Sequence, residues 1–125
     1  MEKEFIPYKQ ALKLKKLGFN ESCFGHWVDS TLDLITTDIN DYPPLYVEVI
    51  KAPLYQQAFR WFREKYNLEV SFYRTMETIE GLKYGYQIER WESETTEDLV
   101  NLYEKSYEEA ELACLKKLIE IIKNK

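Results

Sequence analysis

The segment from Pro53 to Tyr66 constrains the fold more than any other part of the chain, because its apolar residues repeat at helical spacing. The members of this apolar stripe follow the i, i+3, i+4 pattern of a helix buried on one side: Tyr55, Ala58, Phe59, Phe62 and Tyr66. The residues between them are mostly polar or charged. The pattern therefore predicts an amphipathic helix packed on a core, and Asn67 is suited to end it as a left-handed cap.

A second helix is predicted near the beginning of the chain, from about Pro7 to Leu17. Gly18 follows it directly, and glycine readily adopts the left-handed conformation in which many helices end. Phe19 can then fold back on Leu14, as in a Schellman motif.

The last helix is predicted from Ser106 to about Ile122. Ser106 and Glu109 have the spacing of a capping box. The acidic residues of this segment come early and its lysines come late, which matches the helix dipole.

Short apolar runs between the first two helices predict strands. Cys23 to Val28 and Leu32 to Ile35 flank the polar residues Asp29-Ser30-Thr31, so we expect a β-hairpin. Leu45 to Ile50 alternates in the manner of a third strand.

The strongest hairpin signal lies after the central helix. Val70 to Met76 and Lys83 to Trp91 are rich in β-branched and aromatic residues, and a loop with Glu80-Gly81 joins them. We expect an acidic loop from Glu92 to Asp98 and then a short strand from Leu99 to Tyr103.

The predicted order is α-ββ(β)-α-βββ-α, an α+β fold in which three helices pack on one face of a mainly antiparallel sheet. No segment rich in Gly, Ser or Pro divides the chain, so we expect residues 1–125 to form a single compact domain.

Composition excludes several classes of function. The formal net charge of −5 argues against sequence-independent binding to nucleic acid or to an anionic membrane. No apolar run approaches the roughly 20 residues that cross a bilayer, and the first residues do not resemble a signal peptide, so we expect a cytoplasmic protein. Aromatic residues make up 15%, which predicts rings on the surface that are available for contacts.

No catalytic or metal-binding set stands out. His26, the single histidine, lies three positions from Cys23, but side chains at odd spacing on a strand point to opposite faces. A pairing of His26 with Cys114 is an alternative, although two packed, reduced thiols and a part-exposed histidine fit the pattern better. Two cysteines and one histidine do not complete a structural zinc site. We therefore expect no enzyme activity, cofactor or metal.

Carboxylates gather in the predicted acidic loop, at Glu92, Glu94, Glu97 and Asp98. They could bind a hard cation or perform acid–base chemistry. A solvated loop is the simpler interpretation, followed by an acidic docking surface for a basic partner.

Two groups of residues are candidates for binding. Arg60, Trp61 and Arg63 place two cations and a ring on the solvent side or edge of the central helix, a combination found at protein interfaces, at nucleotide contacts and on surfaces that only shield a core. The second group lies on the two long predicted strands. Tyr84 and Tyr86 share a face with Ile88, Trp91 shares the opposite face with Gly85, and Tyr73 lies on the neighbouring strand. If the face of Trp91 and Gly85 is not covered by helices, its residues would form an exposed platform for a peptide or ligand.

Three segments resemble a family of small uncharacterised proteins carried by phages and integrated mobile elements of gut bacteria. They are PLYQQAFRWFREKY (53–66), SYEEAELACLKKLIEIIK (106–123) and EFIPYKQALKLKKLGFNESCFG (4–25), and together they cover nearly half of the chain. The resemblance implies a phage or prophage accessory protein that acts on a host or phage protein. The family has no assigned reaction, so the resemblance implies no catalytic residues.

The order of elements from Pro53 onward is also similar to that of a double-stranded RNA-binding domain. Such domains carry lysines at the start of the last helix, where this chain has Glu108, Glu109 and Glu111. We therefore expect a non-catalytic interaction protein, with homo-oligomerisation left open. A nucleic-acid or nucleotide-binding module and a small hydrolase or transferase are the alternatives.

Overall fold

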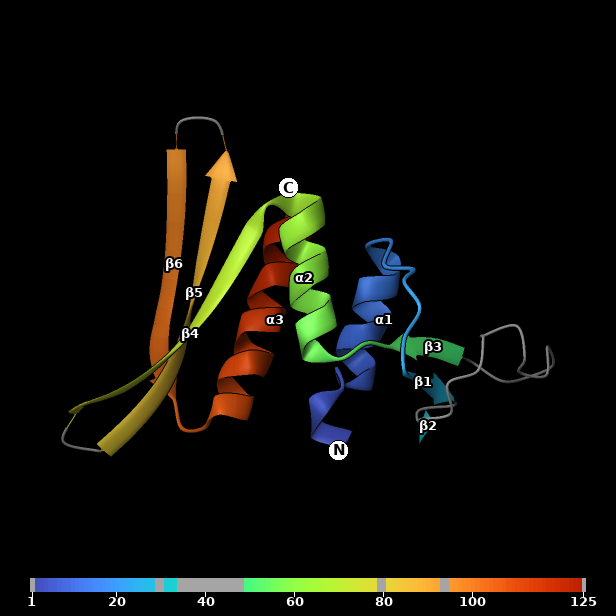
Figure 1. Ribbon diagram of the computed structural model, residues 1–125, viewed down its shortest axis with the longest axis horizontal. Helices are drawn as coiled ribbons and strands as arrows, with labels where there is room; N and C mark the ends of the chain where they lie inside the picture. The colour runs from blue at the N-terminus through green and yellow to red at the C-terminus, as the bar shows by residue number, and fades with distance from the viewer. Residues whose placement is uncertain (1, 29–30, 34–48, 79–80, 93–94, 125) are drawn as a thin grey trace. The chain divides into compact units, whose positions relative to one another are not determined.

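The computed structural model describes residues 2–28, 31–33, 49–78, 81–92 and 95–124 (Figure 1). Contacts between residues group the chain into two compact units, Met1–Ala58 and Phe59–Lys125, each of which is described by itself. The α+β class and the predicted order of helices and strands are confirmed. The strands form two separate three-stranded sheets in place of the single sheet we expected. The interpretation of residues 1–125 as one domain stays a prediction.

The sheet of the first unit has the order β2-β1-β3, and both neighbouring pairs are antiparallel. Its strands are β1 (Gly25–Val28), β2 (Thr31–Asp33) and β3 (Val49–Ala52). The predicted first hairpin is therefore confirmed, although positions 29–30 of its turn lie outside the described residues. The third strand continues to Ala52, beyond its predicted end, and residues 45–48 of that prediction also lie outside the description.

Helix α1 (Tyr8–Lys16) follows a short 3-10 turn, η1 (Glu2–Glu4), and ends as predicted. Gly18 has a φ of 103°, a conformation that a residue with a Cβ adopts only with strain. The Phe19 amide donates to the Leu14 carbonyl at 3.0 Å, and the Gly18 amide donates to the Lys15 carbonyl at 3.1 Å. These two bonds define a Schellman motif.

The core of the first unit forms around the segment that precedes α1. Ile6 is fully buried, and its amide donates to the Pro53 carbonyl at 2.9 Å. Its carbonyl accepts a hydrogen bond from Nε1 of the buried Trp27, also at 2.9 Å. The chain approaches the sheet so closely here that a Cβ on Gly25 would lie 3.0 Å from the Phe5 ring. This packing ties the beginning of the chain to β1.

The sheet of the second unit has the order β4-β5-β6, with antiparallel pairs throughout. Its strands are β4 (Leu68–Thr78), β5 (Gly81–Glu92) and β6 (Thr95–Glu104). The predicted long hairpin is confirmed. The acidic loop expected from Glu92 to Asp98 is wrong at both ends, because Glu92 belongs to β5 and Thr95 to Asp98 pair with β5 and extend β6 toward the amino terminus. Positions 93–94 of that prediction lie outside the described residues.

Helices α2 (Tyr55–Tyr66) and α3 (Tyr107–Lys123) confirm the other two predicted helices. Asn67 has a φ of 58°, as expected of a left-handed cap. Ser106 Oγ accepts from the Glu109 amide at 3.1 Å, while Glu109 Oε2 reaches back to the Lys105 amide. The capping box predicted from the sequence is thus present, except that Glu109 accepts from the amide of Lys105, one residue before Ser106.

The Phe72 ring of β4 contacts a ring from each helix. It lies 5.5 Å from the Phe59 ring of α2 and 5.3 Å from the Tyr107 ring of α3, centroid to centroid. The buried face of α3 includes four residues without measurable exposure: Ala110, Cys114, Leu115 and Leu118. Apolar contacts of this kind hold the second unit together. That all three helices pack on one face stays a prediction.

Candidate functional site

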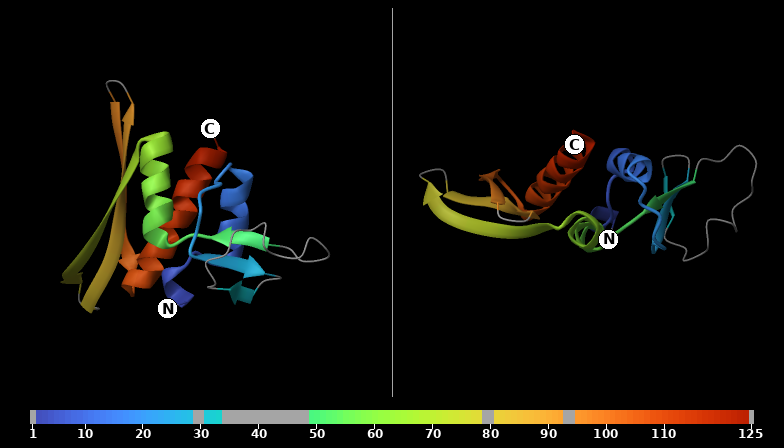
Figure 2. Two further views of the ribbon diagram at one scale, coloured as in Figure 1. Left: turned by 45° about the vertical axis from the view of Figure 1, so that its right-hand side comes forward. Right: turned by 90° about the horizontal axis from the view of Figure 1, so that it is seen from above.

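The β4–β5–β6 sheet has one covered face and one face that its described side chains leave open. On the covered face, Phe72 is opposite Tyr86 and Val70 is opposite Ile88, and Tyr86 and Ile88 are buried. In both views of Figure 2, α3 runs beside one side of this sheet. Residues at the intervening positions point the other way. We call this second side the open face, and its described side chains are Glu69, Ser71, Tyr73, Gln87 and Glu89.

Tyr73 is the most exposed large side chain of the open face, with 42% of its surface accessible. Register places it opposite Gly85, which has no side chain to cover the ring. The Tyr73 hydroxyl donates a hydrogen bond to Oε1 of Gln87, two positions further along β5. The hydrogen bond therefore holds the ring in place, and much of the ring surface stays accessible to solvent. This combination is typical of a contact residue.

Three carboxylate residues occupy facing positions across the same face. Glu69 of β4 is opposite Glu89 of β5, and Glu89 is opposite Asp98 of β6. We call these three positions the carboxylate row. In the described ranges, the side chains of Glu69 and Glu89 make no ion pair or hydrogen bond with another residue. Glu69 and Glu89 are therefore like charges at directly facing positions, an arrangement that does not stabilise a sheet.

The structure separates the predicted tyrosine platform. Tyr84 and Tyr86 do share a face with Ile88, but this is the covered face, and Tyr86 is only 6% exposed. Tyr86 is therefore part of the core, and a binding role for it stays a prediction. Register places Trp91 opposite Thr96, at a position of the open face that it shares with Tyr73.

Trp61 is also buried, contrary to our expectation of a ring on the solvent side of α2. Its ring packs against Phe62 at 5.1 Å and Tyr66 at 5.5 Å, and Lys65 Nζ lies 5.0 Å from its centroid. Arg60 and Arg63 are exposed. The two arginines are therefore accessible to a partner, but the Trp61 ring is not. A binding role for this group stays a prediction.

Both cysteines are reduced, and burial affects each thiol and the single imidazole. His26 is 2% exposed, so the part-exposed histidine that we expected is wrong. Cys23 Sγ donates to the Glu21 carbonyl at 3.4 Å, and burial raises the pKa of this thiol to about 12 against the opposing effect of Lys51. Burial, with a smaller contribution from Glu111, raises the pKa of Cys114 still further. Both thiols are therefore protonated near neutral pH, whereas the reactive form of a cysteine is the thiolate.

Cys23 is expected to react slowly with a thiolate-selective reagent in the folded protein. A shift of the pKa from 9.0 to about 12 lowers the thiolate fraction at pH 8 roughly a thousandfold. Alkylation by iodoacetamide, followed by mass spectrometry, checks this in a Cys114→Ala background, with the urea-unfolded chain as the control. Equal rates in the folded and unfolded states would contradict it.

The same shift predicts how stability depends on pH. The folded thiol stays protonated where the unfolded thiol ionises, so its contribution to stability is constant below about pH 9 and decreases as the pH rises from about 9 toward 12. Urea unfolding measures the free energy of unfolding across this pH range. We expect it to decrease less for Cys23→Ala than for the parent chain.

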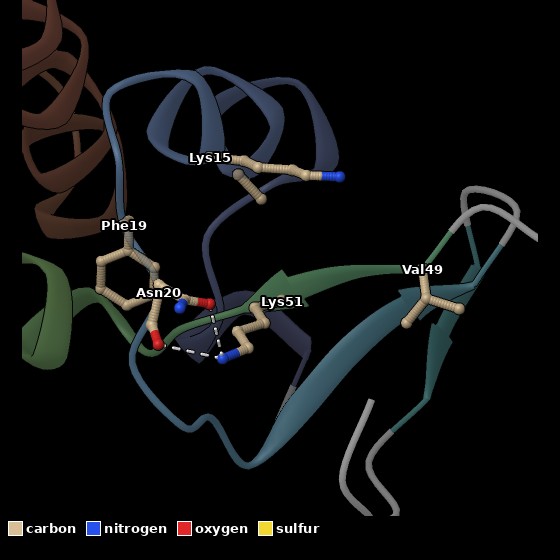
Figure 3. A pocket seen from close by; sticks show the side chains of 6 residues that line it. Lys15, Phe19, Asn20, Val49 and Lys51 are labelled. Carbon is tan, nitrogen blue, oxygen red and sulfur yellow. Dashed lines mark hydrogen bonds between the residues drawn. The ribbon is translucent and has the colours of Figure 1, made fainter. Parts of the chain in front are cut away.

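A small pocket lies in the first unit, between α1, the segment after it and β3 (Figure 3). Its volume of about 60 Å³ is well below the roughly 300 Å³ of a typical small-molecule site. Lys51 Nζ donates to the Asn20 carbonyl at 3.0 Å and to Asn20 Oδ1 at 3.2 Å, while the Lys15 amine points away from Lys51. The two amines therefore do not converge on one anion.

Within the described ranges, no group of His, Cys, Asp or Glu side chains is arranged to hold a metal ion. No helix in the same ranges is long and apolar enough to cross a membrane. Comparison of the chain with protein-family models, curated proteins and solved structures found no match. The functional argument therefore depends on the geometry of this protein alone, and the open face is its best-supported candidate site.

Proposed function

We propose that the chain is a non-catalytic interaction protein that binds a partner protein through the open face of the β4–β5–β6 sheet. The observation that carries this proposal is Tyr73, a large ring with 42% exposure that is positioned by its bond to Gln87. A pre-positioned tyrosine adds contact area at low entropic cost and supplies a polar group at its tip.

The resemblance to proteins of phages and mobile elements adds a setting to this proposal. In that setting the partner is a host or phage protein, and the chain acts in the cytoplasm of a bacterial cell. Arg60 and Arg63, which are exposed on α2, are a second contact region.

Nucleic-acid binding is the alternative that a specific observation favours, because α2, β4, β5, β6 and α3 follow the order of a double-stranded RNA-binding domain. Charge argues against it. Glu108 and Glu109 are exposed at the beginning of α3, where a phosphate would need attraction, and the carboxylate row adds further negative charge to the sheet. A gel shift with double-stranded RNA at low salt distinguishes the two functions, since phosphate contacts are strongest there.

The protein-binding proposal is tested by the loss of one exposed ring. Partners retained from bacterial lysate by the immobilised wild-type chain are identified, and their affinities for Tyr73→Ser and Phe24→Ser are compared. Phe24 is the matched control because it is an exposed ring, at 62%, that lies outside the second unit. Tyr73→Ser is expected to weaken binding at least about tenfold, as for an interface hot spot, while Phe24→Ser leaves it unchanged. A partner that binds both variants equally well would contradict the proposal.

A further inference from the structure

We infer that the partner protein presents an extended segment, which adds a strand to the outer edge of β4 and places one of its side chains beside Tyr73. This inference rests on the proposed function, because it names the conformation and chemistry of the partner segment at the same sheet.

The outer edge of β4 carries backbone groups that the sheet does not pair. The strand order is β4-β5-β6, so β4 pairs with β5 on one side only. Successive residues of a strand direct their amides and carbonyls to alternate sides, so every second residue of β4 points these groups away from β5. In the described part of the chain, only β5 bonds to the backbone of Glu69 to Arg74. Such an edge is a template for a further strand.

The regularity of β4 distinguishes it from the other edges. Natural sheets block their edges with prolines, lysines, bulges or short strands. Leu68 to Thr75 contain no proline or lysine and pair with β5 in one unbroken register, and residues 70–73 in the middle of this run are uncharged. The register of β6 shifts along β5, while β2 and β3 have only three and four residues. Among the described strands, β4 is therefore the edge best suited to accept another strand.

The backbone chemistry of the edge specifies the conformation of the partner segment. The outward groups repeat about every 6.7 Å along β4, which is the length of two residues in an extended chain. A helix bonds its own amides and carbonyls internally, so it offers none of them to a sheet edge along its length. An extended segment matches the edge, whereas a helix does not.

Tyr73 gives the added strand a side-chain contact on the open face. It lies on the edge strand itself, is 42% exposed, and has the exposed Ser71 two residues away on the same face. Its hydroxyl is bonded to Gln87 on the β5 side, so a strand added on the opposite side of β4 leaves this bond intact. Pairs of an aromatic and a β-branched residue stabilise neighbouring strands. We therefore expect a β-branched or aromatic residue in the partner segment at the position that faces Tyr73.

Two synthetic peptides test the inference on the full-length chain. The first alternates threonine and valine over eight residues, with a lysine at each end for solubility. Methyl groups on every second amide leave only one of its edges able to pair and prevent its aggregation. The second peptide has the same sequence with every amide methylated. Isothermal titration calorimetry is expected to show at least about tenfold tighter binding of the first peptide, because only this peptide can donate backbone hydrogen bonds. Equal binding of the two peptides would overturn the inference.

Amide hydrogen exchange, measured by NMR, locates the added strand. The first peptide is expected to slow exchange at least about tenfold at every second residue from Leu68 to Thr75, because the outward amides acquire acceptors. Contact with side chains of the open face alone would leave these amides unchanged and would overturn the inference. Equal slowing in β3 or β6 would also overturn it, since the peptide would then add to any edge.

Tyr73→Ser tests the side-chain contact. This variant is expected to bind the first peptide about twofold to fivefold more weakly, because one cross-strand pair is lost while the backbone bonds remain. Unchanged affinity would overturn the placement of the segment beside Tyr73.

Two outcomes separate the inference from self-association and from the proposed function. Light scattering of the chain alone is expected to give the mass of one chain. A dimer that the first peptide dissociates would overturn the inference, because a second copy would then occupy the edge. If neither peptide binds but the partner from lysate still depends on Tyr73, the inference fails while the proposed function stands.

Discussion

Replacement of Phe62 by alanine is expected to lower the free energy of unfolding by about 3–5 kcal/mol. The Phe62 side chain has no exposed surface, and its ring lies 5.1 Å from that of Trp61 and 6.1 Å from that of Tyr66. Alanine removes the apolar surface that the ring buries and leaves a cavity that these rigid neighbours fill incompletely. Urea unfolding followed by circular dichroism measures the loss.

Phe24→Ala is the matched control, since it deletes the same side chain from a position that is 62% exposed. It is expected to change the free energy of unfolding by no more than about 0.5 kcal/mol. A loss of equal size in both variants would show that the described burial does not account for the contribution of Phe62.

The helices could be predicted closely because their signals are local. The apolar stripe of the central segment, Gly18 after the first helix and Ser106 before the last each act within a few residues of their own position. Gly18 and Asn67 accordingly have the positive φ values that their positions required. The hairpins were also predicted, since alternation and turn residues lie close together in the chain.

The acidic segment shows where local reasoning fails. All four residues from Thr95 to Asp98 pair with β5. The two threonines favour strands, whereas the acidic residues Glu97 and Asp98 have low intrinsic preference for them. The long β5 strand provides hydrogen-bond partners for these residues, and this non-local pairing outweighs their local preference. Sequence alone could not show that the strand begins four residues before its apolar part.

The candidate site was predicted only in part, for a related reason. Alternation correctly placed Tyr84 and Tyr86 together, but it could not indicate which face of the sheet the helices cover. The carboxylate row depends on the register between three strands, and a shift by one residue would separate its members. Trp61 was assigned to the solvent side because the neighbouring arginines are polar, whereas its ring packs along the helix on Phe62 and Tyr66.

Trp27→Phe is expected to destabilise the fold by about 1–3 kcal/mol although an aromatic ring is retained. Trp27 is buried, and its Nε1 donates to the Ile6 carbonyl at 2.9 Å. Phenylalanine has no donor, so the carbonyl loses this bond in a region from which water is excluded. The smaller ring also leaves space beside Tyr8, whose ring meets the indole edge-on at 6.2 Å. Urea unfolding of the two proteins measures the difference.

Tyr73→Phe provides the comparison, because it also removes one side-chain donor while keeping the ring. Its bond to Gln87 is exposed, so water can replace the lost partner, and the expected cost is below about 1 kcal/mol. The difference between the two variants measures the effect of burial on a single hydrogen bond. If Trp27→Phe costs no more than Tyr73→Phe, the bond to Ile6 does not hold the beginning of the chain against β1, and apolar packing of Phe5 and Ile6 alone must do so.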